Sequence, residues 1–246
     1  MNRTVLGIAM VLASQLALGT HAERPLVTVG YRLTYQGRMM GVDCTDWRIA
    51  EIQKDGHILA RCRNYILESS GTDGGNPIRI STLFGVKLVE FLPFSPMLNL
   101  PLVVGKTWQG TYTAFTTDKT NVVETHSECQ VSSFDKIAVI AGDLDAFKIE
   151  CTDTSQSGGK PDIIHTTRWY SPTAAAIVKS LQQENPAKWN FELTSFGLPE
   201  GAPVPAGKAR ASPISHGNSG VPSPPQSPNA DAALQKIAPI RDPLDY

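Results

Sequence analysis

Histidine and carboxylate side chains are the residues of this sequence whose chemistry suits acid–base or metal sites. Beyond residue 22 the histidines are His57, His126, His165 and His216. No two of them have the spacing of a metal-ligand pair. The acidic candidates for an acid–base pair are Glu124, Glu128, Asp135, Glu150 and Asp153. Such residues in strands usually form the solvated face of a sheet, so we expect neither a catalytic site nor a metal site from them.

Glycine-containing motifs add no catalytic or cofactor site. The stretch "GNSG" (217–220) approaches the Gly-x-Ser-x-Gly nucleophile motif, but it lies in a proline-rich segment. The loop "GTDGGN" (71–76) contains one aspartate, too few oxygen ligands for calcium. No glycine-rich loop precedes a predicted helix, as a phosphate loop requires. We expect no cofactor.

Aromatic residues are the remaining candidates for a binding site. They lie in separate strand-like segments: Trp47, Trp108, Tyr112, Trp169, Tyr170, Trp189 and Phe191. On a closed or half-closed sheet they can converge inside, where they fill a core or line an apolar cavity. A filled core is the more frequent outcome, and it predicts that Leu102, Val104, Trp108 and Trp169 are buried anchors. The cavity alternative makes Trp108, Tyr112, Trp169 and Tyr170 ligand-binding residues.

The segments that position these aromatics are typical of an all-β domain over residues 23–198. Short β-branched and aromatic runs alternate with turn residues, including Asp55-Gly56 and Gly142. Residues 173–183 begin like a helix after Ser171-Pro172, but β-branched Ile177 and Val178 favour a strand. We predict an antiparallel sheet that forms a single barrel-like or half-barrel domain.

Four cysteines in an exported chain predict two disulfides, with three possible connectivities. Cys129 and Cys151 lie on either side of the Gly142 turn, and opposing them places Val131 across from Ile149. Both cysteines then share a buried face with Phe147. Cys44 and Cys62 similarly flank the Asp55-Gly56 turn, but their register needs a bulge or a longer loop. A zinc site is disfavoured because the chain has no Cys-x-x-Cys motif.

The two ends of the chain differ from this domain in composition. Residues 1–22 have the parts of a secretory signal peptide: Arg3, an apolar stretch from Val5 to Leu18, and a small-x-small site at residues 20–22. Residues 199–246 contain ten of the eighteen prolines and predict a disordered tail. No later apolar run is long enough for a membrane span. We expect a periplasmic or secreted protein.

Charge is nearly balanced, with 22 basic and 23 acidic residues. A nucleic-acid-binding domain usually has a basic patch, so nucleic acid is not an expected partner.

Three blocks resemble a group of exported bacterial β domains of unknown function, the TapB-like domains. They are "LPLVVGKTWQGTY" (100–112), "VIAGDLDAFKIECTDT" (139–154) and "RWYSPTAAAIVKS" (168–180). The matching residues are Pro101, Leu102, Val104, Gly105, Trp108, Val139, Ala141, Gly142, Ala146, Phe147, Trp169, Tyr170, Ser171, Pro172, Val178 and Lys179. Ile140 replaces a usual proline, and an alanine replaces the glycine before Val178. The resemblance implies an antiparallel β domain of the cell envelope and no particular activity.

We therefore expect a non-enzymatic exported β domain that binds an apolar small molecule or an envelope protein. One alternative is a hydrolase-type enzyme whose site is assembled only in three dimensions. Another is an interaction module that acts through the proline-rich tail.

Overall fold

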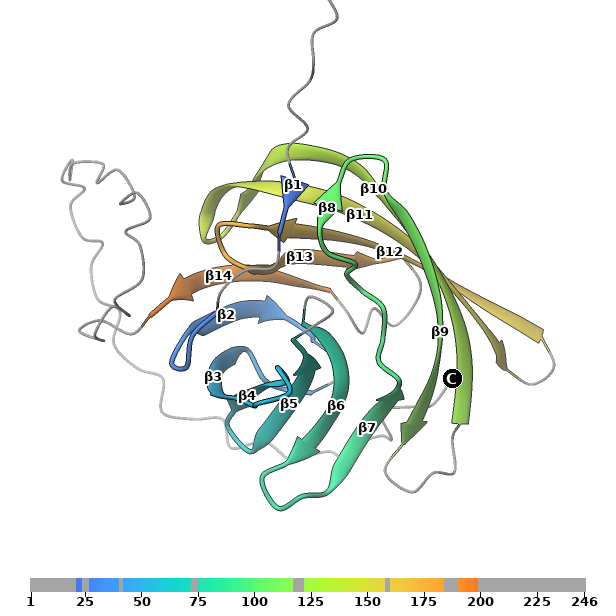
Figure 1. The fold of residues 1–246 in the computed structure, drawn as a ribbon, viewed down its shortest axis with the longest axis horizontal. Helices are drawn as coiled ribbons and strands as arrows, with labels where there is room; N and C mark the ends of the chain where they lie inside the picture. Colours follow the sequence, from blue (N-terminus) through green and yellow to red (C-terminus); the bar gives the residue numbers. More distant parts are fainter. Residues whose placement is uncertain are drawn as a thin grey trace, which may run out of the picture. The chain divides into compact units, whose positions relative to one another are not determined.

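Antiparallel strands make up most of the folded part of the chain (Figure 1). The computed structural model describes residues 21–23, 27–39, 42–71, 75–116, 122–157, 160–183 and 190–198. Its strands are β1 His21–Ala22, β2 Arg32–Gly37, β3 Asp46–Ile52, β4 Ile58–Cys62, β5 Tyr65–Ser70, β6 Asn76–Thr82, β7 Lys87–Leu92, β8 Leu102–Val103, β9 Thr107–Thr116, β10 Val122–Val139, β11 Gly142–Ser157, β12 Lys160–Ser171, β13 Ala176–Gln182 and β14 Phe191–Gly197. In the ranges just given, no helix is long and apolar enough to cross a membrane.

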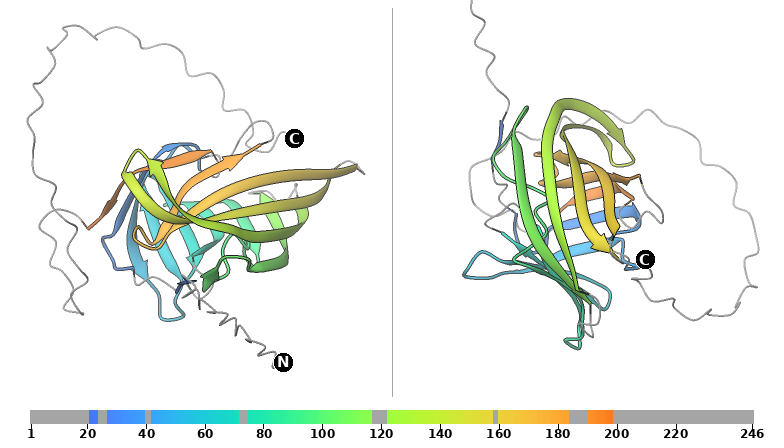
Figure 2. Two further views of the ribbon diagram at one scale, coloured as in Figure 1. Left: turned by 90° about the horizontal axis from the view of Figure 1, so that it is seen from above. Right: turned by 90° about the vertical axis from the view of Figure 1, so that its right-hand side faces the viewer.

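A closed barrel is formed by all of these strands except β1 and β8, which pair with each other. The strand order around the barrel is β10-β11-β12-β13-β14-β2-β3-β4-β5-β6-β7-β9. The predicted all-β class is confirmed, and the sheet closes fully rather than forming a half-barrel. Figure 2 shows β10, β11 and β12, the longest neighbouring strands, curving together along one side of the barrel.

The barrel seam between β13 and β14 is much shorter than the pairing of the long strands. Within the described residues, β13 pairs with β14 only at Lys179 with Glu192 and at Ser180 with Phe191. An ion pair of 2.9 Å between Lys179 Nζ and Glu192 Oε2 reinforces the first of these positions. By contrast, β10 and β11 pair from Thr125 with Ser155 to Val139 with Gly142.

Both predicted disulfides are present. Cys129 lies directly opposite Cys151, with Val131 opposite Ile149 as the hairpin register required. Cys44 bonds to Cys62 over a Cα–Cα distance of 5.9 Å. The β3–β4 hairpin contains a bulge between Ile49 and Glu51, but its register still pairs Arg61 with Arg48, and Cys44 reaches Cys62 from the segment that precedes β3.

The ambiguous segment 173–183 is a strand from Ala176 onward. The chain turns before it, and Ala175 adopts the left-handed region with φ of 55°. Val178 and Ser180 are then fully buried, while Ile177 and Lys179 are half-buried. This period of two is the pattern of a strand, so the helical alternative is wrong.

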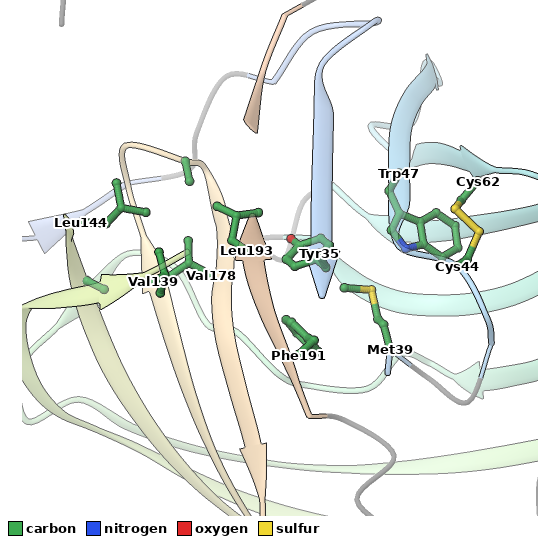
Figure 3. Close-up of a cluster of buried hydrophobic side chains, with 12 residues drawn as sticks. Tyr35, Met39, Cys44, Trp47, Cys62, Val139, Leu144, Val178, Phe191 and Leu193 are labelled. Atoms are coloured by element: carbon green, nitrogen blue, oxygen red, sulfur yellow. A yellow bond between two sulfur atoms is a disulfide. The ribbon is translucent and has the colours of Figure 1, made fainter. Parts of the chain in front are cut away.

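Two clusters of buried apolar side chains fill parts of the barrel. The first core contains Tyr35, Met39, Cys44, Trp47, Cys62, Val139, Leu144, Ala146, Ala174, Val178, Phe191 and Leu193 (Figure 3). The second core contains Ala22, Leu98, Leu102, Cys129, Val131, Phe147, Ile149, Cys151 and Tyr170. Each disulfide therefore belongs to a different core.

The segment between β7 and β9 leaves the sheet and contributes Leu98 and Leu102 to the second core. Asn76, which is fully buried, fixes this segment because its side-chain amide bonds both the backbone N–H and the carbonyl of Leu98, each at 2.8 Å. The predicted burial of Leu102 is confirmed. That of Val104 is wrong, since Val104 is 48% exposed. It lies in the turn completed by Gly105, whose φ of 88° redirects the chain into β9.

Some predictions concern residues outside the described ranges. The signal peptide lies outside them except for His21 and Ala22, and Trp189 and the proline-rich tail lie outside entirely. The signal peptide and the disordered tail therefore stay predictions.

Candidate functional site

An apolar cavity of about 170 Å³ lies inside the barrel. Its walls come from strands around most of the ring and from the segment after β7, and they include Leu33, Tyr35, Met39, Trp47, Ile49, Ile58, Ala60, Leu67, Met97, Leu98, Tyr170, Ile177 and Phe191. Figure 3 shows Tyr35, Met39 and Phe191 pointing toward one another beside Trp47. An apolar cavity of about 150 Å³ in another protein stays free of water and binds benzene. The present cavity can accommodate an apolar group of similar size.

A few polar atoms lie at the wall of this cavity. Tyr35 donates its hydroxyl proton to the carbonyl of Ile177 at 3.2 Å, and burial raises the pKa of Tyr35. This phenol is therefore neutral at physiological pH. Trp47 Nε1 is buried and has no hydrogen-bond partner among the described residues. Figure 3 shows this nitrogen on the side of the ring that faces Met39, so it can donate to an acceptor on a bound molecule.

The four aromatics predicted to bind a ligand do not converge on this cavity. Tyr170 lines it. Trp169, the adjacent residue of β12, is half-buried against the first core. Trp108 is half-buried against the second core and donates Nε1–H to the carbonyl of Pro96 at 2.9 Å. Tyr112 packs edge-on against Phe91, with 5.8 Å between ring centroids.

The residues that sequence reasoning missed are Tyr35, Met97 and Leu98 as cavity walls. The sequence indicates the inward position of Tyr35, because Leu33 and Tyr35 alternate with polar residues in β2. No sequence pattern indicates that Met97 and Leu98 line the cavity, since they lie outside the sheet in an irregular segment.

A second, polar hollow of about 860 Å³ lies along β9 to β12. Side chains there form rows across the strands, such as Gln109, Glu128, Thr152 and His165. His165 Nδ1 lies 3.1 Å from the Thr152 hydroxyl. The exposed side chains of Glu124, Glu128, Asp135 and Glu150 confirm the predicted solvated face.

Asp153 departs from that expectation. It is half-buried and shares the inward-facing side of β11 with Cys151, because the two residues are two positions apart in one strand. The Lys148 ammonium, 2.7 Å from Glu150, lowers the pKa of that exposed carboxyl through a hydrogen bond.

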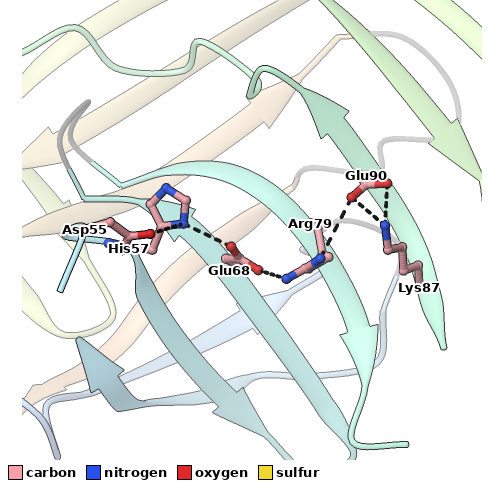
Figure 4. A network of polar contacts seen from close by, with 6 residues as sticks. All are labelled: Asp55, His57, Glu68, Arg79, Lys87 and Glu90. Atoms are coloured by element: carbon pink, nitrogen blue, oxygen red, sulfur yellow. Dashed lines mark hydrogen bonds and ion pairs between the residues drawn. The ribbon is translucent and has the colours of Figure 1, made fainter. Parts of the chain in front are cut away.

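Two histidine–carboxylate pairs are candidates for an enzyme: His126 with Glu128, whose Nε2 and Oε1 lie 3.4 Å apart, and His57 with Glu68 (Figure 4). His57 Nδ1 lies 3.1 Å from Glu68 Oε1 and 3.7 Å from Asp55 Oδ2. Glu68 also pairs with Arg79, which lies 3.9 Å from Glu90. The chain of alternating charges ends at Lys87, 2.8 Å from Glu90.

This network lacks the further parts of a nucleophilic site. No serine, threonine or cysteine side chain of the described residues bonds to His57. His57 also lies outside the walls of the two cavities described above. The geometry is that of mutually neutralising charges across neighbouring strands. In the same described ranges, no cluster of three or more His, Cys, Asp and Glu side chains is placed to bind a metal ion.

No protein-family model matches the sequence, and no curated protein matches it. Solved structures with a similar course of the chain include a protein described as exported, with a YmcC-like fold, from Bacteroides fragilis. It has 14% identity and a TM-score of 0.45, and the match covers 72% of this chain and 99% of that chain.

Two further structures are similar to the same degree. One is described as a lipoprotein from Parabacteroides distasonis, with 11% identity, a TM-score of 0.45, and coverage of 72% of this chain and 99% of that chain. The other is the hypothetical lipoprotein YmcC from Escherichia coli, with 14% identity, a TM-score of 0.43, and coverage of 71% and 89%. Similarity at this level carries no argument about function. The two disulfides of the present chain independently fit an extracytoplasmic location.

Proposed function

We propose that this protein is a non-enzymatic binding domain of the cell envelope that accommodates an apolar group of a small molecule inside its barrel. The observation that supports this function is the apolar cavity of about 170 Å³ walled by Tyr35, Trp47, Tyr170 and Phe191. Export of the chain, as its predicted signal peptide and its disulfides suggest, is part of the proposal. The resemblance to TapB-like domains is compatible with it and adds no ligand.

The size of the cavity limits the ligand. Sites for drug-sized molecules usually enclose about 300–1,000 Å³. A cavity of about 170 Å³ accommodates one ring or one short chain segment. The buried Trp47 Nε1 adds one hydrogen-bond donor for an acceptor on that group. The expected ligand is therefore a molecule with a small apolar part, of which the rest extends beyond this cavity.

Benzene is a suitable neutral probe, because it matches the cavity in size and carries no charge. We expect benzene to raise the melting temperature of the protein and to release heat on titration. Ala60, in β4, lines the cavity, so Ala60→Leu should fill part of it and abolish the benzene effect. Filling a cavity commonly raises the free energy of unfolding by about 0.5–2 kcal/mol, so the variant itself should be more stable than wild type.

Ala138→Leu is the matched control, since Ala138 is exposed on β10 and lies away from the cavity walls. It should leave benzene binding unchanged. A wild-type protein whose melting temperature and heat signal do not respond to benzene contradicts the proposal. Native mass spectrometry of protein purified from its own host would then identify the natural ligand by its mass.

A further inference from the structure

Arg168, near the C-terminal end of β12, is a buried cation without a charged partner in contact. It is 4% exposed. Within the described ranges, no carboxylate oxygen lies within 4.0 Å of its guanidinium, and its Nε has no hydrogen-bond partner. Burial lowers the pKa of Arg168, against the attraction of Asp153 and Tyr112. A buried charge costs several kcal/mol unless it is paired.

Hydroxyl groups lie beside Arg168 on the same inward face of the sheet. Ser180, its register partner on β13, is fully buried, and its hydroxyl also has no partner among the described residues. Thr166, two positions along β12 on the same inward face, is 3% exposed. Asp153 is the carboxylate that acts on Arg168 electrostatically, but it lies beyond ion-pair distance.

We propose that the barrel interior beside Arg168 and Ser180 binds an oxyanion, either a carboxylate or a phosphate group. A guanidinium presents parallel N–H donors that match the two oxygens of such a group. The Ser180 hydroxyl is placed to add a further donor. A bound oxyanion supplies a negative charge in contact with the guanidinium, whereas Asp153 attracts it only from beyond ion-pair distance.

This site is independent of the proposed apolar function, because it uses different residues. The two sites are nevertheless close along the chain. Tyr170, which lines the apolar cavity, is the next residue of β12 after Arg168 on the same face. A single ligand with an apolar part and an acidic head group would therefore use both.

Stability distinguishes a binding role of Arg168 from a structural one. Replacing an unpaired buried charge by an apolar side chain of similar length removes the desolvation penalty of several kcal/mol that the charge carries. We expect Arg168→Met to melt at or above the wild-type temperature in chloride buffer. An arginine that stabilises the fold would give the opposite result, a drop of several degrees.

Acetate and inorganic phosphate, each compared with chloride at the same ionic strength, are the probes for binding. Ligand at about 100 times its Kd stabilises the native state enough to raise the melting temperature of a domain of this size by several degrees. We expect such a rise with at least one probe in wild type and none in Arg168→Met. A response to acetate alone identifies a carboxylate site, and a response to phosphate alone identifies a phosphate site.

Two further variants keep this test decisive. Arg61→Met removes the same charge from an exposed position of β4, and it should keep the full wild-type response. Ser180→Ala should weaken binding of the effective probe about tenfold, the loss of one hydrogen bond to a charged group.

The proposal is overturned if neither anion stabilises wild type beyond chloride, or if Arg168→Met responds as wild type does. It is also overturned if Arg168→Met melts several degrees lower while Ser180→Ala binds the anion normally. Benzene carries no charge and acetate has almost no apolar part. If one probe fails to bind, only the site that this probe tests is therefore contradicted.

Discussion

At the scale of single residues, the environment of each aromatic side chain decides whether it stabilises the fold or contacts a ligand. Tyr170 is almost fully buried and forms a cavity wall. Trp108 instead spans from the second core to the carbonyl of Pro96. It thereby connects β9 to the irregular segment that precedes β8.

Trp108→Ala should destabilise the domain rather than remove a ligand contact. Full burial of a tryptophan makes its truncation cost about 3–5 kcal/mol. Because Trp108 is half-buried, we expect a loss of about 2–3 kcal/mol in urea unfolding, and unchanged benzene binding by the folded protein. Val104→Ala is the control, and as an exposed substitution it should change the free energy of unfolding by less than about 0.5 kcal/mol. A variant that unfolds like wild type would refute the anchoring role of Trp108.

At the scale of elements, two signals in the sequence predicted the hairpin around Gly142. The turn at Gly142 predicted the hairpin, and alternation in 129–131 and 147–151 predicted Cys129 opposite Cys151, which the structure has; a bulge between Val131 and Ser133, which the sequence did not indicate, joins the two registers. Val104 was predicted to be buried from the alternation of apolar residues before β9. The turn at Gly105 ends this alternation, so Val104 lies in the turn instead.

The candidate site was less predictable from the sequence than these hairpins. Its walls come from strands that meet only when the barrel closes, and from Met97 and Leu98, which follow no period. The inward position of Arg168 also conflicts with the usual exposure of arginine, so no local pattern favours it.

Removing either disulfide should cost about 3 kcal/mol, since the loops they close span 18 and 22 residues. The Cys129→Ala/Cys151→Ala and Cys44→Ala/Cys62→Ala double variants test this by urea unfolding under non-reducing conditions. Peptide mapping of the wild type should recover the same two pairs. A recovered link between Cys62 and Cys129 would contradict the structure.

At the scale of the whole molecule, the barrel comprises nearly all of the described residues. The ring of twelve strands is closed, but parts of two strands are paired on one side only among the described residues: Thr107–Tyr112 of β9 pair with β10, and Lys160–Ile164 of β12 pair with β11. Both proposed sites lie inside this ring of strands.

Deleting residues 199–246 should leave the barrel intact, because their composition provides almost no core-forming residues. We expect the melting temperature to change by less than about 1 °C, and benzene and anion binding to be unaffected. Differential scanning calorimetry of the full and truncated chains measures this. A drop of several degrees, equivalent to about 1 kcal/mol or more, would mean that the tail packs on the barrel.

The short seam between β13 and β14 has a kinetic consequence for anything bound inside. Local opening is easiest at a place with few buried contacts and few backbone hydrogen bonds. Here that place is the pairing of Lys179 with Glu192 and of Ser180 with Phe191. Phe191 lines the apolar cavity, and Ser180 is the register partner of Arg168. Opening of this one seam is therefore an expected exit route from either site, and a guest that stabilises the closed seam slows its own release.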